Sequence, residues 1–504
     1  MKVVSSRQMT DLETLAYRDG SSESDFMEEA GSGVALVVHD FAERHSLSRI
    51  VILLCGKGNN AGDAYVAGIH LLHLDYEVYA IQVVPIAECS SLCKANYERF
   101  MSEGGRSAEA LPEFPTSGVI VDGLFGTGFR GKPDEPYAAL ISLANHSGLP
   151  IIAVDIPSGL HGESGIAEGE AIVAQETAFL GLPKTGFFLQ DGWDHVGRLE
   201  YVDFGLPKKY IESCETDIIM LSEDIIRPLM PPIKRSRHKY EAGYVVGLAG
   251  SPGMPGAAML SGSAALRGGA GIVKLLHPEG MENELAFSPY ELIRVPYKYD
   301  NIQPILDLLN HASATYIGPA MGLTPQSRAL LRAILPKIEK PCVIDADALT
   351  ILAEENIALP KDTILTPHHG EMMRLLHREG RPPALTMEFL RSCQDYAASK
   401  NVTLILKGGP TFILRDNETI LVNPTGDPGM ATAGAGDVLT GLLAALLSQG
   451  LSTKDAAMLG VFHHGLAGEI ASEDLSSYCV NASDIIFRFP EAFKFLTDKS
   501  FPQS

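Results

Sequence analysis

The sequence predicts an α/β protein with two doubly wound domains, each a mainly parallel sheet between layers of helices. Three observations support this class. Short β-branched runs alternate with helix-length stretches along the chain, and 504 residues exceed one ordinary core. The alternation stops in a segment at 208–240 that contains clustered prolines and a basic patch. We therefore place a domain boundary there, between residues 1–212 and 213–504.

Nine apolar runs predict the strands of these sheets. Four belong to the first domain: RIVILLC (49–55), EVYAIQVV (77–84), GVIVDG (118–123) and PIIAVD (150–155). Five belong to the second: YVVGLAG (244–250), GIVKLL (271–276), ATYIG (314–318), PCVID (341–345) and VTLILK (402–407). No segment recurs with a period of 20 to 50 residues, so the two halves are different units and not a duplicated repeat.

Composition narrows the class of partner. Forty basic against 62 acidic residues give a net charge of −22, which argues against nucleic-acid or anionic-membrane partners. The seven cysteines have no spacing typical of disulfides or CxxC metal clusters, and no apolar run approaches the roughly 20 residues that span a bilayer. We expect a soluble, cytoplasmic protein with reduced thiols that forms a homo-oligomer.

The first candidate site begins with the turn CGKGNNAGDAYVAG (55–68), between a predicted strand and helix. It matches neither GxGxxG nor GxxxxGK[ST]. Amides and the dipole at a helix start favour an anion, and Asn59, Asn60 and Asp63 add polar side chains. The alternative is structural: Asp63 caps the helix and the asparagines tolerate left-handed backbone.

Two further predicted strands end in a carboxylate and a glycine-rich loop. These are VIVDGLFGTGFRGK, with Asp122, and IIAVDIPSGLHG, with Asp155 and Ser158. Because parallel strands end at one edge of a sheet, the three loops converge on one crevice. Glycines at 126, 128 and 131 allow backbone amides to approach a phosphate, while Asp122, Ser158 and an asparagine offer oxygen ligands suited to a cation.

The second candidate site is the GAGD turn at 434–437, which opens the helix DVLTGLLAALLSQG. Its amides can stabilise a phosphoryl group in transfer, and Asp437 can accept a hydroxyl proton. Lys407, the DADAL loop with Asp345 and Asp347, and LTPHHGEM follow other predicted strands. The alternatives are a solvated cation for Lys407 and capping or packing for the pairs His368–His369 and His463–His464, neither of which we assign to a metal.

The first site resembles the epimerase domain of NAD(P)H-hydrate repair enzymes, through FMEEAG, NNAGDAYV, VDGLFGTGFRG and VDIPSG, over nearly all of residues 1–212. The resemblance implies a Rossmann-like three-layer sandwich, a potassium ion on Asn60, Asp122 and Ser158, and proton handling by Asp155. The damaged dinucleotide would bind Asn59, Asn60, Ala61, Gly62, Asp63, Gly126, Thr127, Gly128, Phe129, Arg130, Gly131, Lys132 and Asp155. Ala61 and Ala64 replace glycines of the usual NNGGDG. A methyl at 61 would narrow the substrate's approach or reject a positive φ angle.

The second site resembles the dehydratase domain of the same enzymes, from LSEDIIRPLMP through GPAMG, VIDADAL, LTPHHGEM, LKGGPT and NPTGDPGMATAGAGD to about residue 495. The resemblance implies a ribokinase-like fold. The adenine nucleotide would bind Lys407, Gly408, Gly409, Pro410, Thr411 and Gly436. The hydrate would contact Ala257, Gly322, His368 and Asp437, with Asp437 catalytic. Ala320, His369 and Ala435 depart from the usual GPGLG, TPHPGE and GTGD.

Together the two resemblances imply a bifunctional enzyme that epimerises hydrated NADH and NADPH and dehydrates the S form. They imply ADP as phosphoryl donor, giving AMP and phosphate, with potassium and magnesium ions as cofactors. Two alternatives stay open. The chain is a ribokinase-like small-molecule kinase with an accessory dinucleotide-binding domain, or its first domain binds dinucleotide as a regulatory module without epimerising it.

Overall fold

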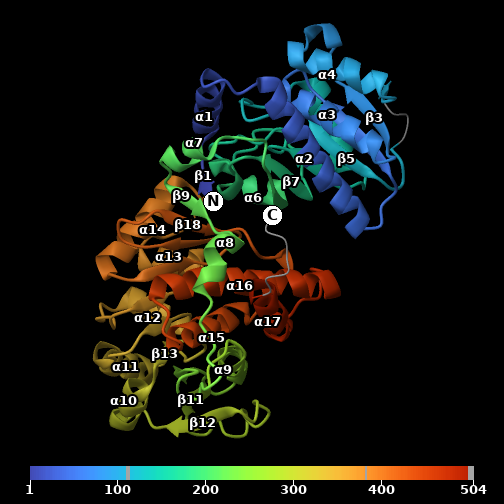
Figure 1. Cartoon of the computed structure of the whole chain (residues 1–504). Helices are drawn as coiled ribbons and strands as arrows, with labels where there is room; N and C mark the ends of the chain where they lie inside the picture. The colour runs from blue at the N-terminus through green and yellow to red at the C-terminus, as the bar shows by residue number, and fades with distance from the viewer. Residues whose placement is uncertain (109–113, 381–382, 498–504) are drawn as a thin grey trace. The chain divides into compact units, whose positions relative to one another are not determined.

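The computed structural model describes residues 1–108, 114–380 and 383–497 and divides into two compact units (Figure 1). Unit 1 comprises Met1–Ile219 and Ala384–Thr386, and unit 2 comprises the remainder. The limits of the functional domains, at residues 212 and 213, remain a prediction.

Unit 1 contains a seven-stranded sheet in the order β4-β3-β2-β5-β6-β7-β8, with every neighbouring pair parallel. A short antiparallel pair joins β1 to β9. The elements are β1 (Lys2–Val3), α1 (Ser6–Arg18), α2 (Glu23–Arg44), β2 (Ile50–Cys55), α3 (Asn59–His73), β3 (Glu77–Gln82), η1 (Ile86–Glu88), α4 (Ser91–Ser102), β4 (Arg106–Ala108), β5 (Val119–Gly123), α5 (Glu135–Asn145), β6 (Ile151–Val154), β7 (Glu176–Leu180), η2 (Thr185–Phe188), α6 (Gly192–Val196), β8 (Arg198–Val202), α7 (Lys208–Ser213) and β9 (Ile218–Met220).

Both faces of this sheet are buried, which explains why its strands read as continuous apolar runs. In β2, Val51 and Leu53 pack into a core cluster with residues of α2, α3 and α4. Ile52 and Leu54 point to the opposite face and pack with residues of α5. The alternation follows from the two-residue period of a strand, and it confirms the predicted layers of helices on both faces.

Unit 2 contains strands in the order β18-β17-β16-β15-β14-β13-β10-β11-β12, parallel except at β16–β17 and β17–β18. Its elements are α8 (Glu223–Ile226), η3 (Arg227–Leu229), β10 (Tyr244–Leu248), α9 (Pro255–Arg267), β11 (Ile272–Pro278), β12 (Leu292–Tyr297), α10 (Ile302–His311), β13 (Ala314–Ile317), α11 (Pro325–Ile334), η4 (Leu335–Lys337), β14 (Cys342–Ile344), α12 (Asp347–Glu354), β15 (Thr363–Leu365), α13 (His369–Leu375), α14 (Met387–Lys400), β16 (Thr403–Leu406), β17 (Thr411–Leu414), β18 (Ile420–Asn423), η5 (Pro428–Met430), α15 (Ala435–Ser448), α16 (Thr453–Leu475) and α17 (Ala482–Thr497).

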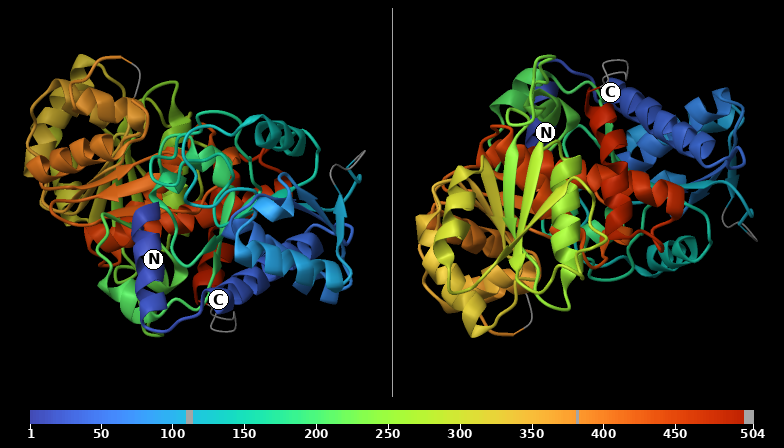
Figure 2. Two further views of the ribbon diagram at one scale, coloured as in Figure 1. Left: turned by 90° about the horizontal axis from the view of Figure 1, so that it is seen from above. Right: turned by 90° about the horizontal axis from the view of Figure 1, so that it is seen from below.

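Helix α15 forms the centre of unit 2. It is buried on nearly all sides, as expected for a helix with an apolar circumference. It approaches α9 so closely that a Cβ on Gly441 would lie 2.0 Å from the Ser261 carbonyl oxygen, so this position requires glycine. Figure 2 shows the strands of this unit side by side, with helices flanking them. The predicted α/β class with mainly parallel sheets is confirmed.

Two general expectations can be compared with the described residues. All seven cysteines are free thiols, five of them buried. No helix within the described ranges is both long and apolar enough to cross a bilayer.

Candidate active sites

Helix α3 begins four residues before Asp63, so Asp63 cannot be its N-cap. It begins at Asn59, its N-cap is Gly58, and no side chain caps it. Asn59 and Asn60 are therefore helical, and Asp63 lies in the second turn. The capping and left-handed interpretation of NNAGD is wrong. Asp63 is instead only 8% exposed, without a hydrogen bond or ion pair to any described residue.

The two alanine departures in this turn are core residues. Ala61 and Ala64 are helical and fully buried, and both belong to the cluster between α3 and the sheet. The expectation that a methyl at 61 narrows the substrate's approach or meets a positive φ is therefore wrong. Ala64 lies so near β5 that a Cβ on Gly123 would be 2.6 Å from its methyl.

The three predicted loops of unit 1 meet at the carboxyl ends of β2, β5 and β6. The Ser158 hydroxyl donates to Asp122 Oδ1 at 2.6 Å, and the Ser158 amide donates to Oδ2 at 2.8 Å. Asn60 Nδ2 donates to the Phe125 carbonyl at 2.9 Å, and the Phe125 amide donates to Ser158 Oγ at the same distance. The predicted convergence of Asn60, Asp122 and Ser158 is therefore seen in the geometry.

This cluster fits a monovalent cation. Asp122 is fully buried, and no cationic side chain of the described residues bonds to it. Burial raises its pKa to about 6, although hydrogen bonds from Ser158 and Leu124 act in the opposite direction. A potassium ion beside Asp122 would offset that cost, with oxygens of Asn60 and Ser158 as further ligands.

The glycine-rich loop at 126–132 borders the same cluster. A Cβ on Gly126 would lie 3.6 Å from Asn60 Cβ, so this loop passes directly over the start of α3. Phe129 stacks on Phe125 with ring centroids 4.4 Å apart, and the loop from Gly128 to Lys132 is largely exposed. Its backbone is accessible to a ligand at the α3 N-terminus. Lys132 lies beside Gly169.

Asp155 adopts a strained backbone at the end of β6, with φ of +64°. The Leu180 amide donates to its Oδ1 at 3.1 Å, and the Lys184 ammonium bonds to the same oxygen. The Lys184 side chain is fully buried, whereas that of Asp155 is 13% exposed. Sequence reasoning missed this lysine. A buried lysine needs a partner, but nothing in the surrounding GLPK segment indicates that it is buried.

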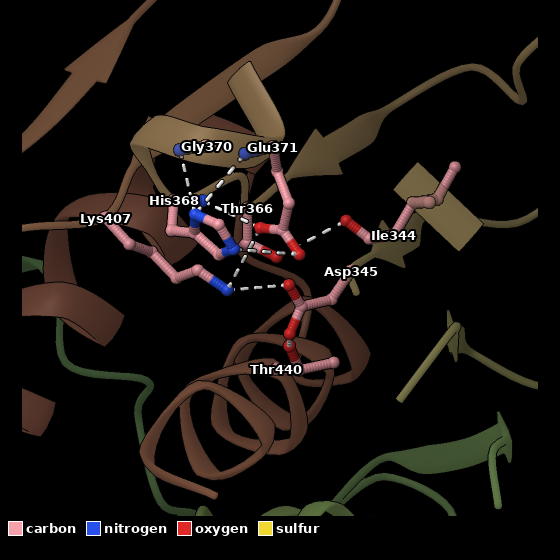
Figure 3. A network of polar contacts seen from close by, with 8 residues as sticks. All are labelled: Ile344, Asp345, Thr366, His368, Gly370, Glu371, Lys407 and Thr440. Atoms are coloured by element: carbon pink, nitrogen blue, oxygen red, sulfur yellow. Dashed lines mark hydrogen bonds and ion pairs between the residues drawn. The ribbon is translucent and has the colours of Figure 1, made fainter. Parts of the chain in front are cut away.

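The central feature of unit 2 is a buried network around Asp345, just after β14 (Figure 3). Lys407 Nζ donates to Asp345 Oδ1 at 2.7 Å, and the Thr440 hydroxyl of α15 donates to Oδ2 at 2.7 Å. Glu371 Oε2 lies 4.0 Å from the same ammonium. Because Lys407 is four-fifths buried and paired, the interpretation as a solvated cation is wrong.

One histidine of each pair has a structural role. His368 is the N-cap of α13, and its Nδ1 accepts from the Gly370 and Glu371 amides at 2.9 and 3.3 Å. The Glu371 carboxylate accepts in return from the His368 amide at 2.8 Å. His463 is buried against Phe493, with ring centroids 3.8 Å apart. The capping and packing interpretations are confirmed for these two residues. The capping hydrogen bonds also hold His368 next to Glu371, at the edge of the network around Asp345.

Asp437 occupies the first turn of α15, whose N-cap Gly434 has a φ of +96°. Burial raises its pKa to about 7; the Asp345, Asp347 and Glu371 carboxylates add to the rise and Lys407 opposes it. A Cβ on the neighbouring Gly436 would lie 3.2 Å from Lys407 Nζ. The turn thus unites a carboxyl group that titrates near neutrality, backbone amides and a fixed ammonium group, as proton abstraction and phosphoryl transfer require.

The other predicted residues of unit 2 lie on several separate elements. The Gly322 amide donates to Asp347 Oδ2 at 2.8 Å, and α9, which carries Ala257, approaches Gly434 through Leu260. Gly408, Gly409 and Pro410 lie in the turn from β16 into β17, and Thr411 is the first residue of β17. Ala320 has a φ of +48°, which explains why glycine is usual there. Ala435 is helical.

The described side chains alone do not form a complete magnesium-binding site. The described residues contain no group of three or more His, Cys, Asp or Glu side chains able to hold a metal. Magnesium commonly binds through one or two carboxylates together with substrate phosphates, so a magnesium ion here would depend on the bound nucleotide.

Each half of the chain matches a known protein family. Residues 23–186 match the family model described as YjeF-related protein N-terminus, and residues 245–490 match the model described as NAD(P)H-hydrate dehydratase. A ribokinase-like superfamily protein from Enterococcus faecalis V583 superposes with a TM-score of 0.51 at 26% identity, over 56% of this chain and 98% of that one. The predicted ribokinase-like fold of the second half is therefore confirmed.

Two curated relatives match nearly the whole chain. The bifunctional NAD(P)H-hydrate repair enzyme of Moorella thermoacetica is 34% identical, over 99% of this chain and 98% of that protein. The enzyme of the same description from Thermofilum pendens is 32% identical, with 99% and 97% covered. Because both family models match and these relatives are covered over nearly their whole length, the chain belongs to the family of bifunctional NAD(P)H-hydrate repair enzymes.

Proposed function

We propose that the chain repairs NADH and NADPH that have gained water on the nicotinamide ring. Unit 1 interconverts the R and S forms, and unit 2 dehydrates the S form with ADP, yielding AMP and phosphate. The observation that carries this proposal is the α15 turn, where Asp437 with a pKa raised to about 7 stands among Lys407, Asp345 and glycine amides.

Dehydration needs a better leaving group than hydroxyl. Asp437 removes the hydroxyl proton, the oxygen attacks the terminal phosphoryl group of ADP, and AMP departs. The ring nitrogen's lone pair then expels phosphate and forms a carbon–nitrogen double bond, and loss of a proton from the adjacent ring carbon restores the neutral reduced ring. Lys407 and the amide of Gly436 stabilise the charge on the moving phosphoryl group, and His368 and Gly322 line the hydrate's side. Magnesium supplies further neutralisation of phosphate charge when it is bound.

Epimerisation prepares the form that unit 2 accepts. The start of α3 and the loop at 126–132 offer backbone amides to the dinucleotide's phosphates, and Asp155 handles the proton. Asn60, Asp122 and Ser158 hold potassium, which offsets phosphate charge near the buried carboxylate. The substrate residues proposed for each unit are those that the sequence predicts. The free thiols are compatible with the proposed cytoplasmic location, and a homo-oligomer is the proposed assembly.

The test gives the purified chain both epimers with ADP or ATP and follows the absorbance of the reduced ring. Recovery from both epimers with ADP supports the proposal. A stable phosphorylated product without recovery supports a small-molecule kinase instead. Faster turnover with ATP, freed of contaminating ADP, overturns the choice of donor. Binding of the R epimer without its conversion supports the alternative in which the first domain is a regulatory module that binds the dinucleotide.

A further inference from the structure

The N-terminal segment is fastened directly beside Lys184 in unit 1. The Val4 amide donates to the Pro183 carbonyl at 3.0 Å, and the Thr185 amide donates to the Val4 carbonyl at 2.9 Å. Residue 4 therefore runs alongside Lys184 in a parallel bridge, and α1 starts two residues later. Leu12 of α1 shares a core cluster with Leu182. The bridge at Val4 and the packing of Leu12 with Leu182 therefore hold α1 next to the segment that carries Lys184.

Four ionisable groups interact around Asp155, at the end of β6. They are Glu13 of α1, Asp63 of α3, Asp155 and Lys184, with electrostatic interactions linking Glu13 to Asp155 and Lys184, and Asp63 to Asp155 and Glu13. Tyr17 and Glu23 complete the surroundings, and Glu23 accepts a 2.9 Å hydrogen bond from Asn59 of the predicted substrate turn. Lys184 is bonded to Asp155, whereas the nine-tenths-buried Asp63 has no polar partner among the described residues.

Three carboxyl groups around one ammonium cannot all be ionised cheaply. Burial raises the pKa of Glu13 to about 7; Asp155 and Glu23 add to this rise, while Lys184 lowers it. Burial also raises the pKa of Asp63 well above its usual value, with Asp155 and Glu13 contributing. Near neutral pH the cluster therefore retains a proton beside Asp155.

We propose that Glu13 is a catalytic proton donor of the epimerase and that Lys184 is a positioning residue, which holds the Asp155 carboxylate opposite Glu13 as the acceptor. The inference rests on the epimerase activity proposed for unit 1. Glu13 lies outside residues 23–186, which match the family model, so that comparison does not cover it.

Inversion at the hydroxyl-bearing carbon breaks a carbon–oxygen bond and forms it again on the other face. Glu13 gives its proton to the hydroxyl, which leaves as water while the ring nitrogen's lone pair forms a carbon–nitrogen double bond. Water then adds from the opposite face, and Asp155 accepts its proton. Proton transfer from Asp155 to Glu13 restores the starting state, so no oxidant or co-reactant is needed.

The test measures epimerisation by the full chain, starting from the pure R epimer without nucleotide and subtracting the spontaneous rate. The wild-type rate should fall as pH rises through about 7, because Glu13 loses its proton there. Glu13→Gln should lower kcat by roughly 10² to 10⁴ with little change in KM, and should remove that alkaline limb. Asp11→Asn, an exposed change on the same helix, should behave as the wild type.

Two further variants separate catalysis from folding. Glu13→Asp keeps a carboxyl group and should restore part of the rate together with the alkaline limb. Lys184→Met removes the cation that lowers the pKa of Glu13, so its residual activity should show the limb at higher pH. Wild-type kcat and an unchanged limb in folded Glu13→Gln, or loss of the limb in Glu13→Asp, overturn the inference. A wild-type chain without epimerisation refutes the proposed function of unit 1 instead.

Discussion

The most direct test of unit 2 is Asp437→Asn, which removes a negative charge and leaves the size of the side chain unchanged. Asp437 lies in the first turn of α15, but no side chain caps this helix, so the change removes no cap. Loss of a general base costs a factor of roughly 10² to 10⁴ in rate, or about 3 to 5 kcal/mol in activation free energy. Dehydration of the S epimer should fall by that factor, while epimerisation continues.

The same change should stabilise the fold at high pH. Burial and neighbouring carboxylates raise the pKa of Asp437 from 3.8 to about 7, which corresponds to at most about 4 kcal/mol. Because the folded pKa is the higher one, this carboxyl group destabilises the fold progressively as pH rises from about 4 to 7. Above pH 7 the cost is complete. The gain in unfolding free energy of Asp437→Asn should therefore be largest above pH 7 and absent below about pH 4.

The assays are ADP-dependent recovery of reduced-ring absorbance and thermal unfolding at several pH values. Asp455→Asn is a matched control, because Asp455 occupies the corresponding first-turn position of α16, where it bonds to Ser452. This control should leave dehydration unchanged. Near-normal dehydration by folded Asp437→Asn would refute the role of Asp437 as base. If folded Asp437→Asn also lost epimerisation, the proposal that the two activities belong to independent sites would be refuted.

Three further predictions concern unit 1. Asp155→Asn should dehydrate the S epimer normally but convert the R epimer only at its spontaneous rate; measurable catalysed conversion would contradict the role of Asp155. Replacing potassium by a large organic cation should slow epimerisation and leave dehydration unchanged, as should Asp122→Ala; an unaffected epimerisation rate would mean that the cation site is misplaced. Ala61→Gly should lower the free energy of unfolding by about 1 to 2 kcal/mol, because it removes a buried methyl from a helix, without faster epimerisation. A faster variant would show that the methyl faces the substrate.

Local patterns in the sequence predict the sheets because each central strand is buried on both faces. The run RIVILLC is typical of a strand with apolar residues on both sides, and the glycine-rich segments that follow such runs lie together at the sheet edge. Hence the convergence of Asn60, Asp122 and Ser158 could be predicted from their places after parallel strands, and β2, β5 and β6 are neighbours in the sheet. Their proposed ligand roles stay predictions.

Interactions that depend on tertiary packing could not be predicted in this way. Lys184 follows Asp155 by 29 positions, and only the packing of β7 against β6 brings the two side chains together. Glu13 reaches the site from a helix fixed by the bridge at Val4. The error at Ala61 arose because α3 starts at Asn59, so a residue expected in a turn is helical.

The ion pair of Lys407 has a consequence for how tightly a nucleotide can bind. A free lysine side chain would lose up to about 2 kcal/mol of rotamer entropy on closing around a phosphate. In unit 2, Asp345 already restricts that side chain, and Thr440 of the buried helix α15 holds Asp345. The entropy of ordering this side chain is therefore lost during folding, and in the nucleotide-binding role proposed for Lys407 the phosphate charge would meet an ammonium group that need not move.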